Sequence, residues 1–156
     1  MIKIVKGDLL EAKEDVIGHQ VNCQGVMGSG VALQIKKKYP DVFETYKNMV
    51  KDYKKANIDL LGLVLTVPVE GSKCVANLFG QDHYGRDGKQ YTDTHQLSKS
   101  LETLRSFAES ENLSVALPYM IGSDRGGADW KEVEAALMEA FNGYEVTLYK
   151  YDGEKQ

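Results

Sequence analysis

Two glycine-rich stretches hold the residues of this chain that could do chemistry. The first runs from Asn22 to Gly30 and the second from Tyr119 to Gly127, and each follows an apolar segment and precedes one with helical spacing. Glycine lets backbone N–H groups approach a ligand closely, and the first turn of a helix adds a partial positive charge. Both stretches therefore predict contacts with an anion, and phosphate is the leading candidate.

Few titratable side chains accompany these stretches. His19 lies three residues before Asn22, and a neutral imidazole could activate a water molecule or protonate a leaving group. Strand alternation places these two side chains on opposite faces unless the strand ends in a bulge, and the alternative role for His19 is a core histidine bonded to a neighbour. Asp124 is the only carboxylate of the second stretch and could orient a water molecule or simply form a turn, whereas Arg125 could pair with a phosphate.

The nicotinamide-dinucleotide and Walker fingerprints fit this sequence poorly. Gly28-x-Gly30 lacks the third glycine of G-x-G-x-x-G because Leu33 stands there, and it follows the second predicted strand rather than the first. No acidic residue ends a neighbouring strand about 20 residues on, and no G-K-S/T occurs. A nicotinamide oxidoreductase is therefore disfavoured. The glycines could merely form turns, but two such stretches at equivalent positions favour a binding site.

Alternating strand and helix patterns position these stretches. Asp41 is the expected N-cap of the second helix, and Thr92 or Asp93 caps the third. A turn at 70–72 joins two strands as an antiparallel hairpin, with Pro68 at a sheet edge or near a strand end. The pattern predicts an α/β protein, a three-layer α/β/α fold with a central mixed sheet. The predicted strands are 2–6, 16–22, 62–69, 73–79, 113–117 and 144–151, and the helices are 30–38, 42–55, 93–111 and 130–141.

The two glycine-rich stretches should meet at one edge of this sheet. Each comes after a predicted strand and before a helix, and open α/β sheets bind ligands in the crevice at the carboxyl ends of their strands. Two facing glycine loops could clamp a diphosphate between two sets of backbone amides. The sequence therefore predicts one anion site built from both stretches.

Composition narrows the class of protein further. Hydrophobic residues make up 42% of the chain, charged residues 27%, and the net charge is −4, which is ordinary for a globular protein and gives no overall attraction to nucleic acid or anionic lipid. Cys23 and Cys74 have neither metal-site nor disulfide-framework spacing. No secretion signal or membrane span is evident, so we expect a single cytoplasmic domain over 1–151 with a polar tail at 152–156. No motif calls for a metal or cofactor.

Four motifs, taken in order, carry a family resemblance. They are Gly7 to Leu10 (GDLL), His19 to Cys23 (HQVNC), Gly25 to Ala32 (GVMGSGVA) and Pro118 to Trp130 (PYMIGSDRGGADW). Together they resemble a macrodomain, and the set spans nearly the whole chain. The branch that they resemble includes the small stand-alone ADP-ribose 1″-phosphate phosphatases and the terminal ADP-ribose protein glycohydrolases. The resemblance implies an ADP-ribose ligand and a mixed sheet between helices.

The resemblance also implies how the ligand is bound. Asp8 would accept a hydrogen bond from the adenine amino group, the Leu9 amide would contact the ring, and Tyr151 would pack beside the adenosine. The 25–30 loop would wrap the distal ribose and one phosphate, and 121–126 would wrap the diphosphate. The implied ligand-binding residues are Asp8, Leu9, Asn22, Gly25, Met27, Gly28, Ser29, Gly30, Val31, Met120, Ile121, Gly122, Ser123, Asp124, Arg125, Gly126 and Tyr151.

The catalytic candidates are His19, Asn22 and Asp124. His19 matches a histidine proposed to be catalytic in the phosphatases, Asn22 would stand near the distal ribose, and Asp124 could orient a water molecule toward its anomeric carbon. Two departures bear on the chemistry: the aspartate of the glycohydrolases falls where this chain has Gly126, and their lysine aligns near Tyr91, with Lys89 close but unmatched. A lysine-linked ribose intermediate is therefore not expected.

These inferences predict a protein that binds ADP-ribose and hydrolyses a derivative at the distal ribose: a 1″-phosphate, an O-acyl ester or an ADP-ribosyl adduct. The alternative is a reader module that binds ADP-ribose without turnover. Residues 82–84 would border the distal ribose, either as a gate or as a solvated loop tip. The expected partners are ADP-ribose or an ADP-ribosylated substrate, with nucleic acid only as such a substrate and no membrane; the oligomeric state is open.

Overall fold

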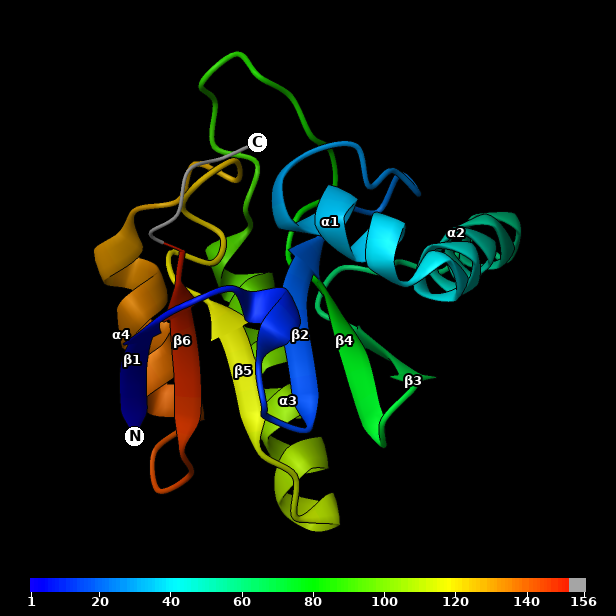
Figure 1. The fold of residues 1–156 in the computed structure, drawn as a ribbon. Coiled ribbons are helices and arrows are strands. Elements are labelled where there is room, and N and C mark those ends of the chain that lie inside the picture. The colour runs from blue at the N-terminus through cyan, green and yellow to red at the C-terminus, as the bar shows by residue number, and fades with distance from the viewer. Residues whose placement is uncertain (152–156) are drawn as a thin grey trace.

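A six-stranded sheet lies at the centre of the computed structural model, which describes residues 1–151. The strands follow the order β1-β6-β5-β2-β4-β3, with β3 antiparallel to β4 and the other neighbours parallel (Figure 1). The mixed sheet and the hairpin are thus confirmed, and Pro68 lies in the edge strand. The predicted tail at 152–156 lies outside the described residues. The strand bounds are β1 (Ile2–Lys6), β2 (Val16–Val21), β3 (Val64–Val69), β4 (Lys73–Phe79), β5 (Val115–Pro118) and β6 (Val146–Lys150).

Within residues 1–151, four α-helices cover the two faces of the sheet. One layer consists of α1 (Gly30–Lys38) and α2 (Pro40–Lys55), and the other of α3 (Thr94–Glu111) and α4 (Trp130–Ala140) (Figure 1). Buried apolar side chains of α1 and α2 pack with those of β3 and β4, and those of α3 and α4 pack with those of β5 and β6. A short 3-10 helix, η1 (Leu9–Glu11), follows β1. The three-layer α/β/α fold is therefore confirmed.

The starts of two helices test the predicted caps. α2 begins at Pro40 rather than after Asp41, because the fixed φ of proline suits the first turn of a helix. Tyr39 is its N-cap, so the capping role predicted for Asp41 is wrong, and this carboxylate instead lies in the first turn. Asp93 does cap α3, where its side chain accepts a hydrogen bond from the Gln96 N–H at 3.1 Å.

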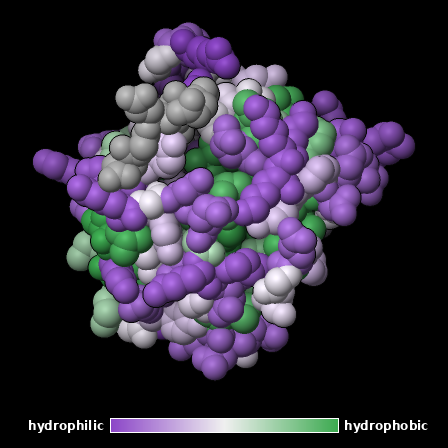
Figure 2. All heavy atoms as spheres, in the orientation of Figure 1, coloured by the Kyte–Doolittle hydropathy of each residue, from purple (hydrophilic) through white to green (hydrophobic). Residues whose placement is uncertain are grey.

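Much of the surface is hydrophilic. On the face shown in Figure 2, hydrophilic residues cover most of the molecule and hydrophobic residues appear as smaller patches. In the lysine run at the end of α1, Lys37 and Lys38 are exposed, and Lys38 forms an ion pair with Glu11 at 2.9 Å. No helix within residues 1–151 is both long and apolar enough to cross a membrane.

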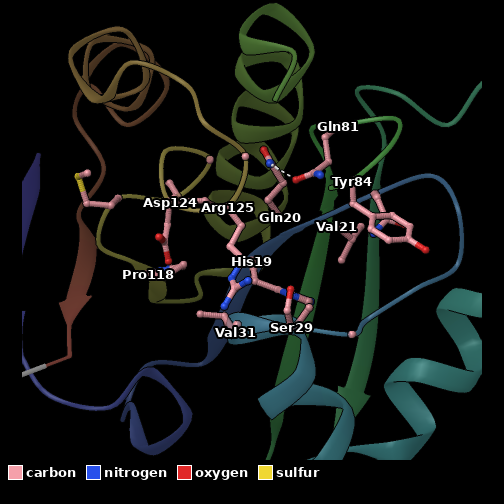
Figure 3. Close-up of a pocket in the computed structure, with 18 of the residues that line it drawn as sticks. His19, Gln20, Val21, Ser29, Val31, Gln81, Tyr84, Pro118, Asp124 and Arg125 are labelled. Carbon is pink, nitrogen blue, oxygen red and sulfur yellow. Dashed lines mark hydrogen bonds between the residues drawn. The ribbon is translucent and has the colours of Figure 1, made fainter. Parts of the chain in front are cut away.

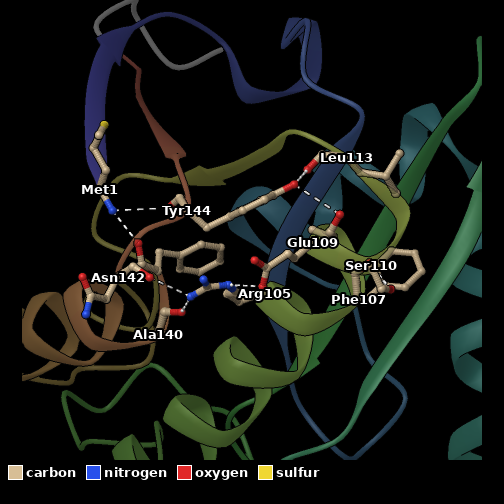
Figure 4. A network of polar contacts seen from close by, with 11 residues as sticks. Met1, Arg105, Phe107, Glu109, Ser110, Leu113, Ala140, Asn142 and Tyr144 are labelled. Carbon is tan, nitrogen blue, oxygen red and sulfur yellow. Dashed lines mark hydrogen bonds and ion pairs between the residues drawn. The ribbon is translucent and has the colours of Figure 1, made fainter.

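Arg105 on α3 ties together the C-terminal ends of α3 and α4 (Figure 4). Its Nη1 donates to the carbonyl oxygens of Ala140 at 3.0 Å and Asn142 at 2.9 Å, and its Nε donates to Glu109 at 3.0 Å. The guanidinium also lies over the ring of Tyr144, 5.5 Å from the centroid. Because the last carbonyls of a helix have no partners inside that helix, Arg105 provides a donor to the partly buried carbonyl of Ala140 at the end of α4.

Replacing Arg105 should destabilise the fold more than an ordinary surface substitution does. We expect Arg105→Met to lower the free energy of unfolding by about 2 kcal/mol, because carbonyl oxygens at the end of α4 lose a charged donor. Ser106→Ala, at the next and exposed position of α3, is the control and should change it by less than about 0.5 kcal/mol. Urea unfolding measures both, and equal losses in the two variants would contradict the role given to Arg105.

Candidate active site

A cavity of about 400 Å³ opens at the carboxyl ends of β2 and β5. Three segments enclose it, here named the first wall (residues 26–32), the second wall (118–126) and the third wall (81–86). Figure 3 shows side chains of all three around one space. The two glycine-rich stretches therefore meet at one edge of the sheet, where the order of the elements predicts them.

Asn22 shapes the loop that leads into the first wall. Its Nδ2 donates to the Val26 carbonyl at 2.9 Å, and its Oδ1 accepts from the Gln24 N–H at 2.9 Å and from the hydroxyl of Tyr46 at 2.8 Å. Tyr46 is fully buried on α2, so the loop is anchored to a packed helix. β2 ends at Val21, which frees the Asn22 side chain from strand alternation and lets it turn toward α2.

The first wall ends in the N-terminus of α1. Ser29 is the N-cap in extended conformation, and its side chain makes no capping hydrogen bond within residues 1–151. Gly30 has φ +59°, a left-handed conformation that favours glycine. The first turn of a helix leaves its N–H groups without partners inside the helix, and 28–32 line the cavity. This wall therefore offers backbone donors and the positive end of a helix to an anion.

Gln20 holds the second and third walls in place. Its Nε2 donates to Gln81 Oε1 at 2.6 Å, drawn in Figure 3, and to Thr92 Oγ1 at 2.8 Å. The Thr92 hydroxyl in turn donates to the Gly122 carbonyl at 2.7 Å. Gln20 thus connects the central strand directly to the third wall and, through Thr92, to the second wall.

Position 126 requires glycine because there is no space for a side chain, not because of an unusual backbone conformation. A Cβ built there would lie 2.0 Å from Thr92 Oγ1 and 2.6 Å from the carbonyl oxygen of Gly122. Its own carbonyl accepts from the N–H groups of Tyr91 at 2.7 Å and Thr92 at 3.0 Å. Position 126 therefore has no room for a side chain in this backbone, and this includes the aspartate that the resemblance to the glycohydrolases implies for their corresponding position.

His19 is a buried, neutral histidine. It is 1% exposed, and its Nε2 lies 2.7 Å from Oδ1 of Asn77, whose Nδ2 donates to the Leu65 carbonyl at 3.0 Å. That second bond orients the amide, so His19 donates from Nε2 and keeps a lone pair on Nδ1, which has no hydrogen-bond partner within residues 1–151. Burial lowers the pKa of His19 from 6.5 to about 4, although the bond to Asn77 acts the other way. These contacts are those of a core histidine, and its catalytic role stays a prediction.

Asp124 and Arg125 are exposed at the mouth of the cavity. Arg125 extends across it, and a Cβ built on Gly30 would lie 3.8 Å from its Nε. Figure 3 shows Asp124 directed toward Pro118 and Arg125 directed toward Val31. Neither forms an ion pair with another residue in 1–151, so both charges are open to a ligand.

Most of the predicted ligand residues line the cavity, and six do not. Asp8 caps η1 through a bond from the Leu10 N–H at 3.0 Å, and Leu9 is a core residue at 5% exposure. Met27, at 1% exposure, packs into the core under α2. The predicted residues in the lining are His19, Asn22, Gly28, Ser29, Gly30, Val31, Met120, Ile121, Gly122, Asp124, Arg125 and Gly126; those outside it are Asp8, Leu9, Gly25, Met27, Ser123 and Tyr151.

Sequence reasoning missed several lining residues. Gln20 could have been found, because it alternates with His19 near the carboxyl end of the central strand. Nothing in the local pattern indicates that Arg86 faces the cavity, since it lies in an irregular loop. Of the segment 82–84, predicted to border the distal ribose, Tyr84 lines the cavity and Asp82 and His83 do not. The lining residues that were not predicted are Gln20, Val21, Val26, Ala32, Gln81, Gly85, Arg86, Pro118 and Tyr119.

Comparison with known proteins agrees with the fold. A family model described as Macro domain matches residues 19–137, more than half of the chain, so the chain belongs to the Macro domain family and the resemblance is confirmed. It is 35% identical over 142 residues to a DNA ADP-ribosyl glycohydrolase of Mycobacterium tuberculosis, covering 90% of this chain and 39% of that protein. It is 26% identical over 181 residues to an ADP-ribose 1″-phosphate phosphatase of Debaryomyces hansenii, covering 97% and 100%.

A solved structure matches at similar identity. The macrodomain of Mycobacterium tuberculosis DarG superposes with a TM-score of 0.80 at 30% identity, covering 96% of this chain and 97% of that one. The chain spans only 39–41% of the length of the three glycohydrolases that it matches. The similarity therefore concerns one part of those longer proteins.

Filling the space at Gly126 should displace the second wall. We expect Gly126→Ala to lower the free energy of unfolding by about 3 kcal/mol, because the new methyl group overlaps a hydroxyl and a carbonyl oxygen. Gly71→Ala is the matched control: Gly71 has φ +76° with no atom near its Cβ position, so only backbone strain of about 1 kcal/mol applies. Urea unfolding compares them, and a Gly126→Ala protein as stable as the control would show that the wall is not tightly packed.

The buried His19 should make stability fall in mild acid. Between pH 6.5 and about 4 the unfolded chain takes up a proton on this histidine and the folded protein does not, so the free energy of unfolding decreases as pH falls through that window. The full effect is about 3 kcal/mol. Urea unfolding of wild type and His19→Gln from pH 7 to 4 measures it, because carboxylate titration is common to both. Parallel stability curves would contradict the lowered pKa.

Proposed function

We propose that this protein binds ADP-ribose and hydrolyses an ADP-ribose derivative at the distal ribose. The observation that carries the proposal is the pair of facing walls, which present the N-terminus of α1 and the backbone of 120–126 to one cavity of about 400 Å³. A cavity of this size suits a ligand of nucleotide dimensions. The curated names of two relatives, an ADP-ribosyl glycohydrolase and an ADP-ribose 1″-phosphate phosphatase, both refer to ADP-ribose derivatives.

The ligand would span the cavity between two ends. Its diphosphate would lie between the first and second walls, where backbone N–H groups and the planar donors of Arg125 offset its charge. The distal ribose would lie at the end marked by Asn22, and the adenosine would extend toward Asp8 and Leu9, as the family resemblance implies. Tyr151 would stay beside the adenosine as a predicted contact.

Hydrolysis would use a water molecule near the distal ribose. Asp124 is the one carboxylate of the lining and would orient it, which requires the side chain to turn from Pro118, toward which Figure 3 shows it directed, to the distal ribose. Asn22 would contribute mainly by holding the loop. The Nδ1 lone pair of His19 could accept a hydrogen bond, but its Nε2 proton is committed to Asn77. The Lys89 side chain is 77% exposed, and its Nζ lies 3.8 Å from Oδ2 of Asp87. Lys89 is not among the residues that line the cavity, so we propose a route without a lysine-linked intermediate.

A non-catalytic reader is the second candidate, and one observation favours it. The one histidine of the lining has a pKa of about 4, far from neutral pH, and it is almost wholly buried. General acid–base catalysis works best with a group that titrates near the working pH.

A cytoplasmic location remains part of the proposal, and the two unpaired cysteines, Cys23 and Cys74, are compatible with a reducing compartment.

Calorimetry and product analysis test the proposal together. We expect ADP-ribose to bind wild type and to bind Arg125→Gln about tenfold more weakly, because a charged donor to the diphosphate is lost. Lys131→Gln, an exposed charge on α4 outside the lining, should bind like wild type. Incubation with ADP-ribose 1″-phosphate, O-acetyl-ADP-ribose and ADP-ribosylated protein or DNA then identifies turnover, which Asp124→Asn should slow by about a hundredfold.

Each outcome of that experiment decides between the candidates. Turnover of any of these compounds by wild type supports the hydrolase. Binding of ADP-ribose without turnover of any of them establishes the reader instead. Absence of ADP-ribose binding would reject both.

A further inference from the structure

Arg86 in the third wall is a cavity residue whose charge nothing in the described chain neutralises. It lines the cavity together with Tyr84 and Gly85, and it makes no ion pair or hydrogen bond within residues 1–151. It is exposed, as is expected of a side chain at the rim of an open site. The planar donors of an unpaired guanidinium at a binding cavity suit a phosphate or carboxylate group of a ligand.

The nearest carboxylates in sequence are already engaged. Asp82 Oδ1 accepts from Gln24 Nε2 at 3.2 Å, and its Oδ2 lies 3.6 Å from His83 Nε2. Asp87 Oδ1 accepts from the hydroxyl of Tyr91 at 2.8 Å and from the Lys89 N–H at 3.2 Å. Both acidic side chains of the loop are thus directed to other partners, and Arg86 is left to the cavity.

Contacts at the start of the third wall locate it along the cavity. The Cys23 N–H donates to the Asp82 carbonyl at 2.9 Å, and the Cys23 thiol contacts the Gln81 carbonyl at 3.4 Å. The third wall is therefore fixed to the segment that follows Asn22, the end assigned above to the distal ribose. Arg125, by contrast, crosses from the second wall to the helix that would hold the diphosphate.

We propose that Arg86 binds a phosphate group carried by the distal ribose or by the moiety attached to it. The protein would then prefer phosphate-bearing derivatives over O-acyl esters and over ADP-ribose itself. The lining holds two arginines and one carboxylate in a chain of net charge −4, so positive potential is concentrated at this cavity. This inference rests on the proposed function, because that function supplies the orientation of the ligand.

Two sources could supply this phosphate. One is a phosphate monoester on the 1″ oxygen, and the other is a backbone phosphate of a nucleic acid strand linked to the ribose. The chemistry at Arg86 is the same in both, a planar guanidinium donating to phosphate oxygens. The ligands used in the test separate the two.

The test compares wild type, Arg86→Gln and Lys89→Gln on four ligands. These are ADP-ribose, ADP-ribose 1″-phosphate, a single-stranded oligodeoxynucleotide with one ADP-ribosylated base, and the matching ADP-ribosyl nucleoside without backbone phosphates. Calorimetry gives Kd, and KM replaces it for any ligand that is turned over. Lys89→Gln is the matched control, because it removes the same charge from the same loop at a side chain outside the lining.

We expect Arg86→Gln to bind ADP-ribose within about twofold of wild type and to bind a phosphate-bearing ligand roughly three- to tenfold more weakly. That penalty should shrink in 0.5 M salt, because dissolved ions screen an exposed ion pair and the Debye length is then only about 4 Å. The control should bind every ligand like wild type. A loss confined to ADP-ribose 1″-phosphate identifies a monoester, and a loss on the oligonucleotide but not on the nucleoside identifies a backbone phosphate.

Two results would overturn the inference while leaving the proposed function in place. One is an equal loss on ADP-ribose and on its derivatives, which would assign Arg86 to the diphosphate. The other is no loss on either phosphate-bearing ligand. Failure of wild type to bind ADP-ribose would instead reject the proposed function, and this inference with it.

Discussion

The hydrogen bonds of Gln20 hold the walls of the cavity against the central strand of the sheet. The side-chain amide nitrogen of Gln20 donates to both Gln81 and Thr92, and the Thr92 hydroxyl donates to the carbonyl of Gly122. The backbone at Gly80 can lie this close to the Gln20 side chain only because it has no Cβ, since a Cβ there would lie 2.2 Å from Gln20 Oε1. Glycines around this side chain therefore provide room for a polar bridge, and the shape of the site follows from that bridge.

The site separates recognition from catalysis. Recognition rests on fixed features, namely backbone N–H groups, a helix N-terminus and two arginines that have no partner within residues 1–151. These features do not titrate near neutral pH, so they attract an anion over a wide range of pH. The groups available for chemistry are less specialised, because His19 is held neutral in the core and Asp124 is exposed at the mouth.

Local patterns account for the part of the structure that the sequence predicts. Strand and helix periods, the 70–72 turn and the cap at Asp93 each depend on a few adjacent residues, and they were sufficient to place both glycine-rich stretches at one sheet edge. The missed features depend on contacts distant in sequence. The bridge made by Gln20 needs segments some 60 to 70 residues away. Arg86 lines the cavity from an irregular loop whose course no local pattern predicts, and Met27 packs in a core cluster with side chains of α2.

The central claim is that two backbone walls bind one ligand together. Amide nuclear magnetic resonance during a titration with ADP-ribose tests it most directly, because it reports on each N–H group separately. We predict that the amide signals of 30–32 and of 121–126 shift together and give the same Kd. Signals that shift on one wall alone, or with different affinities on the two walls, would contradict the account.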